Sequence, residues 1–331
     1  MIKDSSNNNG YKIIIIISFK KMLETNISGL KLKLNSPIIL ASGILGVSYS
    51  SMKRVIDAGA GAVTTKSIGP EPRKGYKNPS IIEVYPDTFM NAVGLGNPGI
   101  DNFISEIKKI KELNIPLIVS VFGDTNDSYI SVAKKAEQAG ADAIELNISC
   151  PHAEVSSIGI DKDLTYSLVS DIKKKITSPI LVKLNPNVTD IGEIALSAEK
   201  AGADAVVAIN TVAALIIDIN TKRPILSHGS GGLSGKAIHP IAVKKVYDLY
   251  KLLKIPIIGC GGVSDWKDVI EFILAGASAV QIGTALYQGT KIITEINEGL
   301  TYFLKENGYK SITEVKGLAH EFKTQEVPDF D

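Results

Sequence analysis

The sequence predicts an α/β protein built as a (β/α)8 TIM barrel, and a repeated motif is the first sign of that fold. The motif reads Ala-Gly-Ala at its start, begins at Ala58, Ala139, Ala201 and Ala275, and runs into an apolar segment each time. A helical pattern such as SVAKKAEQ precedes it. A helix that ends at glycine and leads into a strand buried on both faces is the repeating unit of parallel α/β folds.

Four further apolar segments, each led by proline, alternate with the repeated motif. Proline is tolerated at the first residue of a strand, where its missing N–H does little harm. Together the two sets predict eight strands, at 37–42, 62–67, 116–122, 143–149, 179–184, 205–210, 256–261 and 279–284. A doubly wound open sheet is the alternative, but eight units in a chain of 331 residues favour the closed barrel.

Two long excursions and an N-terminal extension complete the predicted organisation. Residues 68–100 follow the second strand and residues 212–236 follow the sixth, so both are expected to form elaborated loops over the C-terminal face, where barrel active sites lie. Residues 1–21 join a polar stretch to about six apolar residues, too few for a membrane span of about 20. They are also too few for a signal peptide. We expect a dispensable extension and one domain over residues 22–331.

Composition is typical of a soluble globular protein. Hydrophobic residues make up 44% and charged residues 21%, and the net charge is +1. The mixed charges do not suggest a nucleic-acid or membrane surface. The two cysteines, Cys150 and Cys260, form neither a disulfide framework nor a ligand set for zinc or an iron–sulfur cluster. A cytoplasmic protein without a metal site is the expectation.

Small and polar residues gather at the predicted strand ends. They are Ala41, Ser42, Gly43, Lys66, Ser67, Asn147, Cys150, Lys183, Asn185, Asn210, Thr211, Gly261, Gly262, Gly283 and Thr284. Burying such polar groups without partners costs a few kcal/mol each, so a bound ligand is the simplest explanation. Barrels often bind phosphate after strands seven and eight, where these glycines allow close backbone approach. Tight turns alone are the alternative.

Two lysines, Lys66 and Lys183, interrupt apolar strand patterns. A lysine inside a strand covered by helices favours a buried anion or an electron-rich ring as its partner over a surface position. The glycine-rich segment 229–235 does not match a dinucleotide-binding fingerprint, because Ser234 replaces its last glycine.

Eight motifs together resemble the soluble class 1 dihydroorotate dehydrogenases, FMN enzymes of pyrimidine biosynthesis. They are TTKS (64–67), NAVGLGNPG (91–99), NISCP (147–151), VKLNPN (182–187), AINT (208–211), GGLSG (231–235), GCGG (259–262) and QIGTA (281–285). The resemblance covers residues 22–310 in order. It implies that Cys150 is the catalytic base, taking the C5 proton of dihydroorotate while the C6 hydride passes to FMN.

The resemblance also implies binding roles. The residues matching substrate positions are Lys66, Asn91, Gly94, Leu95, Asn147, Asn210 and Thr211. Those matching FMN positions are Ala41, Ser42, Gly43, Lys66, Ser67, Asn147, Lys183, Ile209, Gly235, Cys260, Gly261, Gly262, Gly283 and Thr284. Two positions depart from the family pattern: His152 stands where asparagine usually contacts orotate, and Met90 replaces a leucine. The loop 153–161 is expected to be a lid.

The electron acceptor and the exact substrate stay open at this point. Relatives that use fumarate are single chains, whereas those that use NAD pair with an FAD/iron–sulfur subunit. A homodimer or a heterotetramer is the expected assembly. The segment EPRKGYKNPS (71–80) favours the partner-using branch. Two rival functions remain. The chain could be a related FMN barrel that acts on another pyrimidine, or a barrel that binds a ligand without catalysis.

Overall fold

The computed structural model describes residues 21–149 and 158–322, and its centre is a closed barrel of eight parallel strands. In barrel order these are β3 (Ile38–Leu40), β4 (Ala62–Thr64), β7 (Leu117–Val121), β8 (Ala143–Asn147), β9 (Ile180–Lys183), β10 (Ala205–Ala208), β15 (Ile257–Cys260) and β16 (Ala279–Ile282). Each lies within one of the predicted segments and is shorter by two or three residues, mostly at its C-terminal end. The barrel prediction is confirmed, and the open sheet is excluded.

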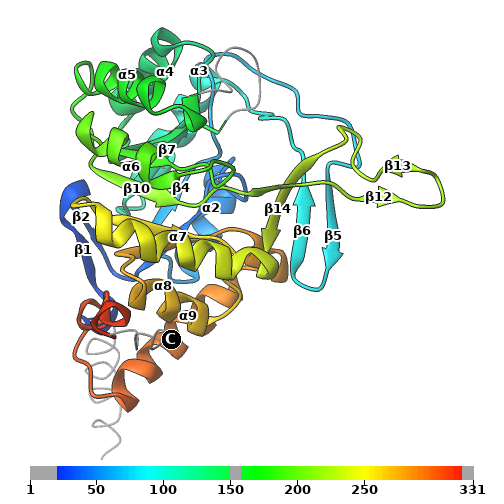
Figure 1. Ribbon diagram of the computed structural model, residues 1–331. Coiled ribbons are helices and arrows are strands. Elements are labelled where there is room, and N and C mark those ends of the chain that lie inside the picture. Colours follow the sequence, from blue (N-terminus) through cyan, green and yellow to red (C-terminus); the bar gives the residue numbers. More distant parts are fainter. Residues whose placement is uncertain (1–20, 150–157, 323–331) are drawn as a thin grey trace, which may run out of the picture.

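Helices surround the barrel (Figure 1). They are α2 (Tyr49–Asp57), α3 (Ile100–Lys111), α4 (Asn126–Ala139), α5 (Lys162–Lys173), α6 (Ile191–Lys200), α7 (His239–Leu252), α8 (Trp266–Leu274) and α9 (Lys291–Glu306). Short 3₁₀ segments are η1 (Ser28–Leu30), η3 (Lys236–Ile238), η4 (Thr284–Gln288), η5 (Ile312–Glu314) and η6 (Leu318–Glu321). The larger apolar core lies between strands and helices.

The repeated motif has the predicted structure. Its glycines, Gly59, Gly140, Gly202 and Gly276, all have positive φ, between 100° and 112°. This left-handed conformation favours glycine, and it turns the chain from the end of a helix into the next strand. The same physical requirement therefore recurs at four places around the barrel.

A hairpin closes the N-terminal end of the barrel. It consists of β1 (Thr25–Ile27) and β2 (Leu32–Leu34), joined by η1. Ile27, Leu30 and Leu34 are almost fully buried and pack with inward-facing residues such as Leu181 and Ile258 in a second apolar cluster. The lower part of the barrel interior is thus apolar, and the polar residues lie above it.

The two excursions form a sheet rather than loops alone. β5 (Ile81–Tyr85) and β6 (Thr88–Asn91) come from the first excursion, and β11 (Val212–Ala214) and β14 (Gly231–Gly235) from the second. They pair antiparallel in the order β11-β14-β6-β5, on the opposite side of the barrel from β1 and β2 (Figure 1). A small hairpin, β12 (Ile217–Asp218) and β13 (Arg223–Pro224), projects beyond them. β14 is glycine-rich and β11 has only three residues, which hid this pairing from sequence analysis.

Some predictions fall outside the described residues. These are the extension up to residue 20, Cys150, His152 and most of the expected lid. Within the described ranges, no helix is long and apolar enough to cross a membrane.

Candidate active site

Ser67, Ser120 and Asn147 form one hydrogen-bonded group at the C-terminal ends of neighbouring strands. The Asn147 side-chain amide donates to Ser67 Oγ at 3.0 Å, and Ser67 Oγ lies 3.0 Å from Ser120 Oγ. The backbone carbonyl of Asn147 accepts from Tyr129 Oη at 2.8 Å. The predicted residues Ser67 and Asn147 therefore meet, and helix α4 holds the end of β8 through Tyr129.

Lys183 lies inside the barrel and is only 4% exposed. Its ammonium donates to Gln281 Oε1 at 2.5 Å and to Cys260 Sγ at 3.2 Å. Lys183 and Cys260 are the last residues of β9 and β15, so the pair stands at the mouth end of the interior. The prediction of a buried rather than a surface lysine is confirmed for Lys183.

Lys66 follows β4 and is half-buried. Burial lowers the pKa of its ammonium group, because removing water disfavours the charged form. Within the described residues its ammonium makes no hydrogen bond or ion pair. A buried cation without a partner is suited to an anionic ligand, which would replace the water that burial has removed.

The excursion sheet brings Asn91 and Thr211 together. Asn91 Nδ2 donates to the carbonyl oxygen of Gly232 at 3.3 Å. Gly232 in turn packs so closely on Thr211 that a Cβ there would lie 2.1 Å from Thr211 Oγ1. Asn210 Oδ1 accepts from the Thr211 backbone N–H at 2.8 Å. Three predicted substrate residues from different parts of the chain thus share one neighbourhood.

Gly94 and Leu95 lie on the loop after β6, both with positive φ (77° and 54°). A Cβ on Gly94 would lie 2.9 Å from the ring of Tyr76, so this loop is packed against residues 73–76. Asn97 Nδ2 donates to the Leu95 carbonyl at 3.0 Å. In the described ranges no hydrogen bond joins Gly94 or Leu95 to Lys66 or Asn147.

The predicted phosphate-binding segments lie at the ends of β15, β16 and β3. A Cβ on Gly283 would sit 3.5 Å from Ala41 Cβ, which places these two strand ends side by side, and Ser42 follows directly. A Cβ on Gly43 would meet nothing within 4 Å, so the chain here faces open space. A Cβ on Gly261 would lie 3.7 Å from Ile209 Cγ1. This lining of small residues fits a bulky anionic group such as phosphate.

Gly235 and Thr284 occupy the edges of this region. Gly235 ends β14, and a Cβ there would lie 2.1 Å from the Asp87 carbonyl oxygen. Thr284 begins η4, directly after Gly283. Tyr287 of η4 donates to Asp87, which ties η4 to the β5–β6 turn.

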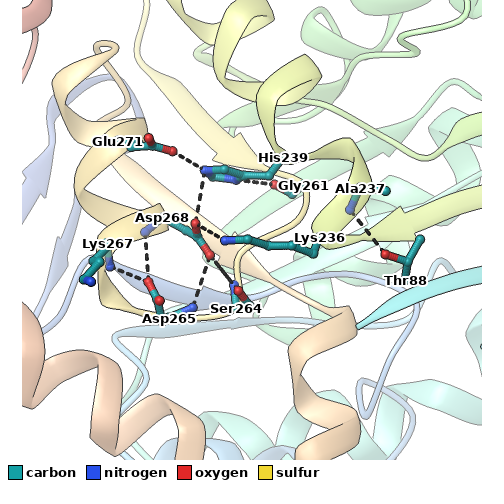
Figure 2. A network of polar contacts seen from close by, with 10 residues as sticks. All are labelled: Thr88, Lys236, Ala237, His239, Gly261, Ser264, Asp265, Lys267, Asp268 and Glu271. Atoms are coloured by element: carbon teal, nitrogen blue, oxygen red, sulfur yellow. Dashed lines mark hydrogen bonds and ion pairs between the residues drawn. The ribbon is translucent and has the colours of Figure 1, made fainter. Parts of the chain in front are cut away.

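A charged network supports the glycine segment after β15 (Figure 2). His239, the first residue of α7, lies 3.1 Å from the Gly261 carbonyl through Nδ1 and 2.7 Å from Glu271 through Nε2. Both ring nitrogens face acceptors, so both contacts are hydrogen bonds only when both nitrogens carry protons. Lys236 pairs with Asp268 at 2.6 Å, and His239 Nε2 lies 3.4 Å from the same oxygen.

Asp268 is the centre of this network. Burial alone would raise its pKa, but hydrogen bonds from Lys236 and Ser264 and the charge of His239 outweigh burial and hold the pKa below its ordinary value. His239, Asp268 and Glu271 offer ligand atoms within 4.8 Å of one another, as a metal site would require. Their mutual hydrogen bonds and the Lys236 ammonium instead give an ion-pair network that anchors the glycine segment.

Sequence analysis missed several residues of the site. Thr64, Ser120, Glu145 and Gln281 are fully or almost fully buried, and they face the barrel interior with Lys183. The sequence did carry a signal for these four residues. Each is a polar residue within an apolar strand segment, as Lys183 is. His239 gave no comparable signal, because its contacts depend on how α7 packs against α8.

Known proteins resemble this chain over nearly its whole length. A family model described as dihydroorotate dehydrogenase matches residues 22–304. A Pyrococcus abyssi protein named dihydroorotate dehydrogenase B (NAD(+)), catalytic subunit, is 50% identical over 301 residues, which cover 90% of this chain and 99% of that protein. A Methanosarcina mazei protein of the same name is 49% identical over 306 residues, 91% and 96% of the two chains.

A solved structure is similar in fold. The crystal structure of DHODH from Eimeria tenella in complex with ferulenol matches with a TM-score of 0.79 over 96% of both chains. The sequences are 23% identical, so this likeness concerns the fold alone.

Replacing Gly262 by alanine tests the packing beneath the glycine segment. Gly262 has φ 70°, and a Cβ there would lie 2.6 Å from His239 Cβ and 2.7 Å from its backbone. Gly308 has φ 76° and open space around the same position, so Gly308→Ala carries the strain without the clash. We expect Gly262→Ala to lose about 1–3 kcal/mol more than Gly308→Ala in urea unfolding. Equal losses would contradict the described packing.

Proposed function

The chain belongs to the dihydroorotate dehydrogenase family, and we propose that it is an FMN-dependent catalytic subunit in which Cys150 accepts the substrate proton. The enzyme is an oxidoreductase that converts dihydroorotate to orotate in pyrimidine biosynthesis, and its family is flavin-dependent. The observation that carries the assignment is the family match over residues 22–304. The finer statement on FMN is supported by the site described above, the statement on the base by the sequence resemblance, and the statement on the partner by the names of the relatives.

The residues at the barrel mouth fit FMN. Gly43, Gly283 and Ala41 leave room for a phosphate group at the ends of β3 and β16, and Gly261 and Gly262 lie at the neighbouring strand end. Lys183 would hold the ring system with a positive charge. When bound, FMN supplies the acceptor for the two electrons that leave the substrate.

The chain's own polar groups would orient the substrate. Lys66 offers an unpaired ammonium to the substrate carboxylate. Asn91, Asn147 and Asn210 offer carboxamides, which both donate and accept hydrogen bonds and so suit an imide ring. Cys150 follows the end of β8 by three residues and would take the proton from the substrate carbon, as a thiolate can.

A partner subunit is part of the proposal. The relatives compared above are named as catalytic subunits of an NAD(+) enzyme, and they extend over nearly the same length as this chain. We propose an FAD/iron–sulfur subunit as the route to NAD, and a homodimer or a heterotetramer as the assembly. A cytoplasmic location agrees with two cysteines and no disulfide framework.

Anaerobic reduction tests the function and the partner together. The purified chain should bind one FMN, and dihydroorotate should bleach it, whereas a dihydropyrimidine without a carboxylate should not. Without a partner subunit, the bleached chain should not be reoxidised by NAD or by fumarate, so neither should restore the flavin colour. A colourless chain that ignores FMN would refute the flavin proposal, and rapid reoxidation by NAD alone would refute the need for a partner.

Cys150→Ala tests the base. A general base typically contributes about 10²–10⁴-fold, so bleaching by dihydroorotate should slow by that factor while FMN and orotate still bind. Cys150→Ser should keep part of the rate, and more of it at higher pH, because a hydroxyl gives up its proton less readily than a thiol. The measurement is stopped-flow absorbance across pH. A wild-type rate in Cys150→Ala would assign the proton to another group.

Lys66→Met tests the carboxylate contact. Because burial lowers the pKa of Lys66, its charge is complete below that lowered pKa and is lost as pH rises through it. Orotate binding should weaken over the same rise in pH. Lys66→Met should weaken binding at neutral pH by about 10- to 100-fold and remove that part of the pH dependence. Lys74→Met, an exposed lysine of the same excursion, is the matched control and should change neither. Titration calorimetry with orotate measures both.

A further inference from the structure

Two opposite charges are buried in the barrel interior, on the neighbouring strands β8 and β9. Glu145 is fully buried and Lys183 is 4% exposed. Lys183 pairs in register with Asn147, and Glu145 with Leu181, so Glu145 lies one layer deeper in the barrel. Burying an isolated carboxylate costs several kcal/mol, and a compensating charge is the usual reason that one persists.

Gln281 joins these two charges from the other side of the barrel. Its Oε1 accepts from Lys183 Nζ at 2.5 Å, and its Nε2 donates to Glu145 Oε2 at 2.7 Å. An amide oxygen can only accept and an amide nitrogen can only donate. The cation and the anion therefore impose one orientation on the Gln281 side chain, and each charge is held by the amide end that matches it.

The surroundings leave this bridge few other partners. Glu145 Oε1 is buried and has no hydrogen-bond partner among the described residues. Below the bridge the interior is apolar, with Leu181, Ile118 and Ile258 in the floor. Lys183 uses two of its three N–H donors, on Gln281 and Cys260. The third has no partner in the described ranges and is free to contact a ligand at the mouth.

We propose that Glu145 is the buried counter-charge of Lys183 and acts through Gln281 as a positioning residue for the lysine ammonium. The carboxylate orients the amide, the amide oxygen holds the ammonium at the mouth, and the negative charge partly offsets the positive one. The proposal concerns Glu145, which lies outside the motifs of the sequence analysis, and Gln281, which begins the QIGTA motif but was assigned no role there. The charge pairing does not depend on the proposed function. The effect on bound FMN does, because it requires that Lys183 contacts FMN.

A double-mutant cycle on the flavin-free chain tests the charge pairing. Lys183→Met leaves Glu145 buried without its counter-charge, so thermal unfolding should shift down by at least about 5 °C. Adding Glu145→Gln to Lys183→Met should recover most of that loss, because no isolated charge remains. If Lys183→Met yields no folded protein, recovery of folded protein in the double variant supports the pairing. Losses that simply add in the double variant, or a double variant that also fails to fold, overturn the proposal.

The midpoint potential of bound FMN tests the effect at the mouth. Glu145→Gln removes the offsetting negative charge, so Lys183 should favour the reduced, more negative flavin and the potential should rise. Glu112→Gln, an exposed residue that follows α3, makes the same substitution outside the barrel and should leave the potential unchanged. FMN that binds and is bleached by dihydroorotate, but has an unchanged potential in Glu145→Gln, overturns this inference and leaves the proposed function intact. A chain that binds no FMN refutes the cofactor proposal, and the double-mutant cycle then decides the pairing alone.

Discussion

Closure of eight parallel strands into a barrel decides which side chains share the interior, and the rest of the site depends on it. Side chains of a strand alternate between its two faces, so every second residue of each strand points inward. Leu181 and Ile258 fall in the lower layer with the β1–β2 hairpin beneath them, and Glu145 and Gln281 fall in the layer above. The apolar floor keeps water from the polar layer, which strengthens every charged contact within it.

The excursion sheet gives the site its second wall. β6 and β14 are separated by about 140 residues in sequence, yet they pair through four residues, including Asn91 opposite Gly232. Backbone pairing holds Asn91 beside Thr211 more firmly than two independent loops would, because each strand orders the other. The side of the mouth proposed for the substrate is therefore built by pairing between excursions, whereas the side proposed for phosphate is built by the strand ends themselves.

The side proposed for phosphate depends on charged residues that lie behind its glycines and do not face the mouth themselves. Gly261 and Gly262 provide no side chain of their own, so their conformation is held by what packs behind them. His239 contacts the Gly261 carbonyl, and the carboxylates of Asp268 and Glu271 lie against its other ring nitrogen, with Lys236 paired to Asp268. This arrangement resembles that of Lys183, where a buried cation is also held by a neighbour and balanced by a carboxylate. Both sides of the mouth thus hold their candidate ligand-binding groups through buried ion networks.

The sequence alone determined the elements of the barrel and indicated candidate site residues at the strand ends. Helix period, strand runs and the Ala-Gly-Ala turns are local, so all eight barrel strands could be predicted, and Lys183 stood out as a charge in an apolar strand. The tertiary structure decided the partners. Gln281 reaches Glu145 and Lys183 across the barrel, β14 pairs with β6, and His239 meets Gly261. A sequence shows a residue's type and the face it occupies, but barrel closure and strand register decide which distant side chain lies opposite it, because those contacts form only when the whole barrel is assembled.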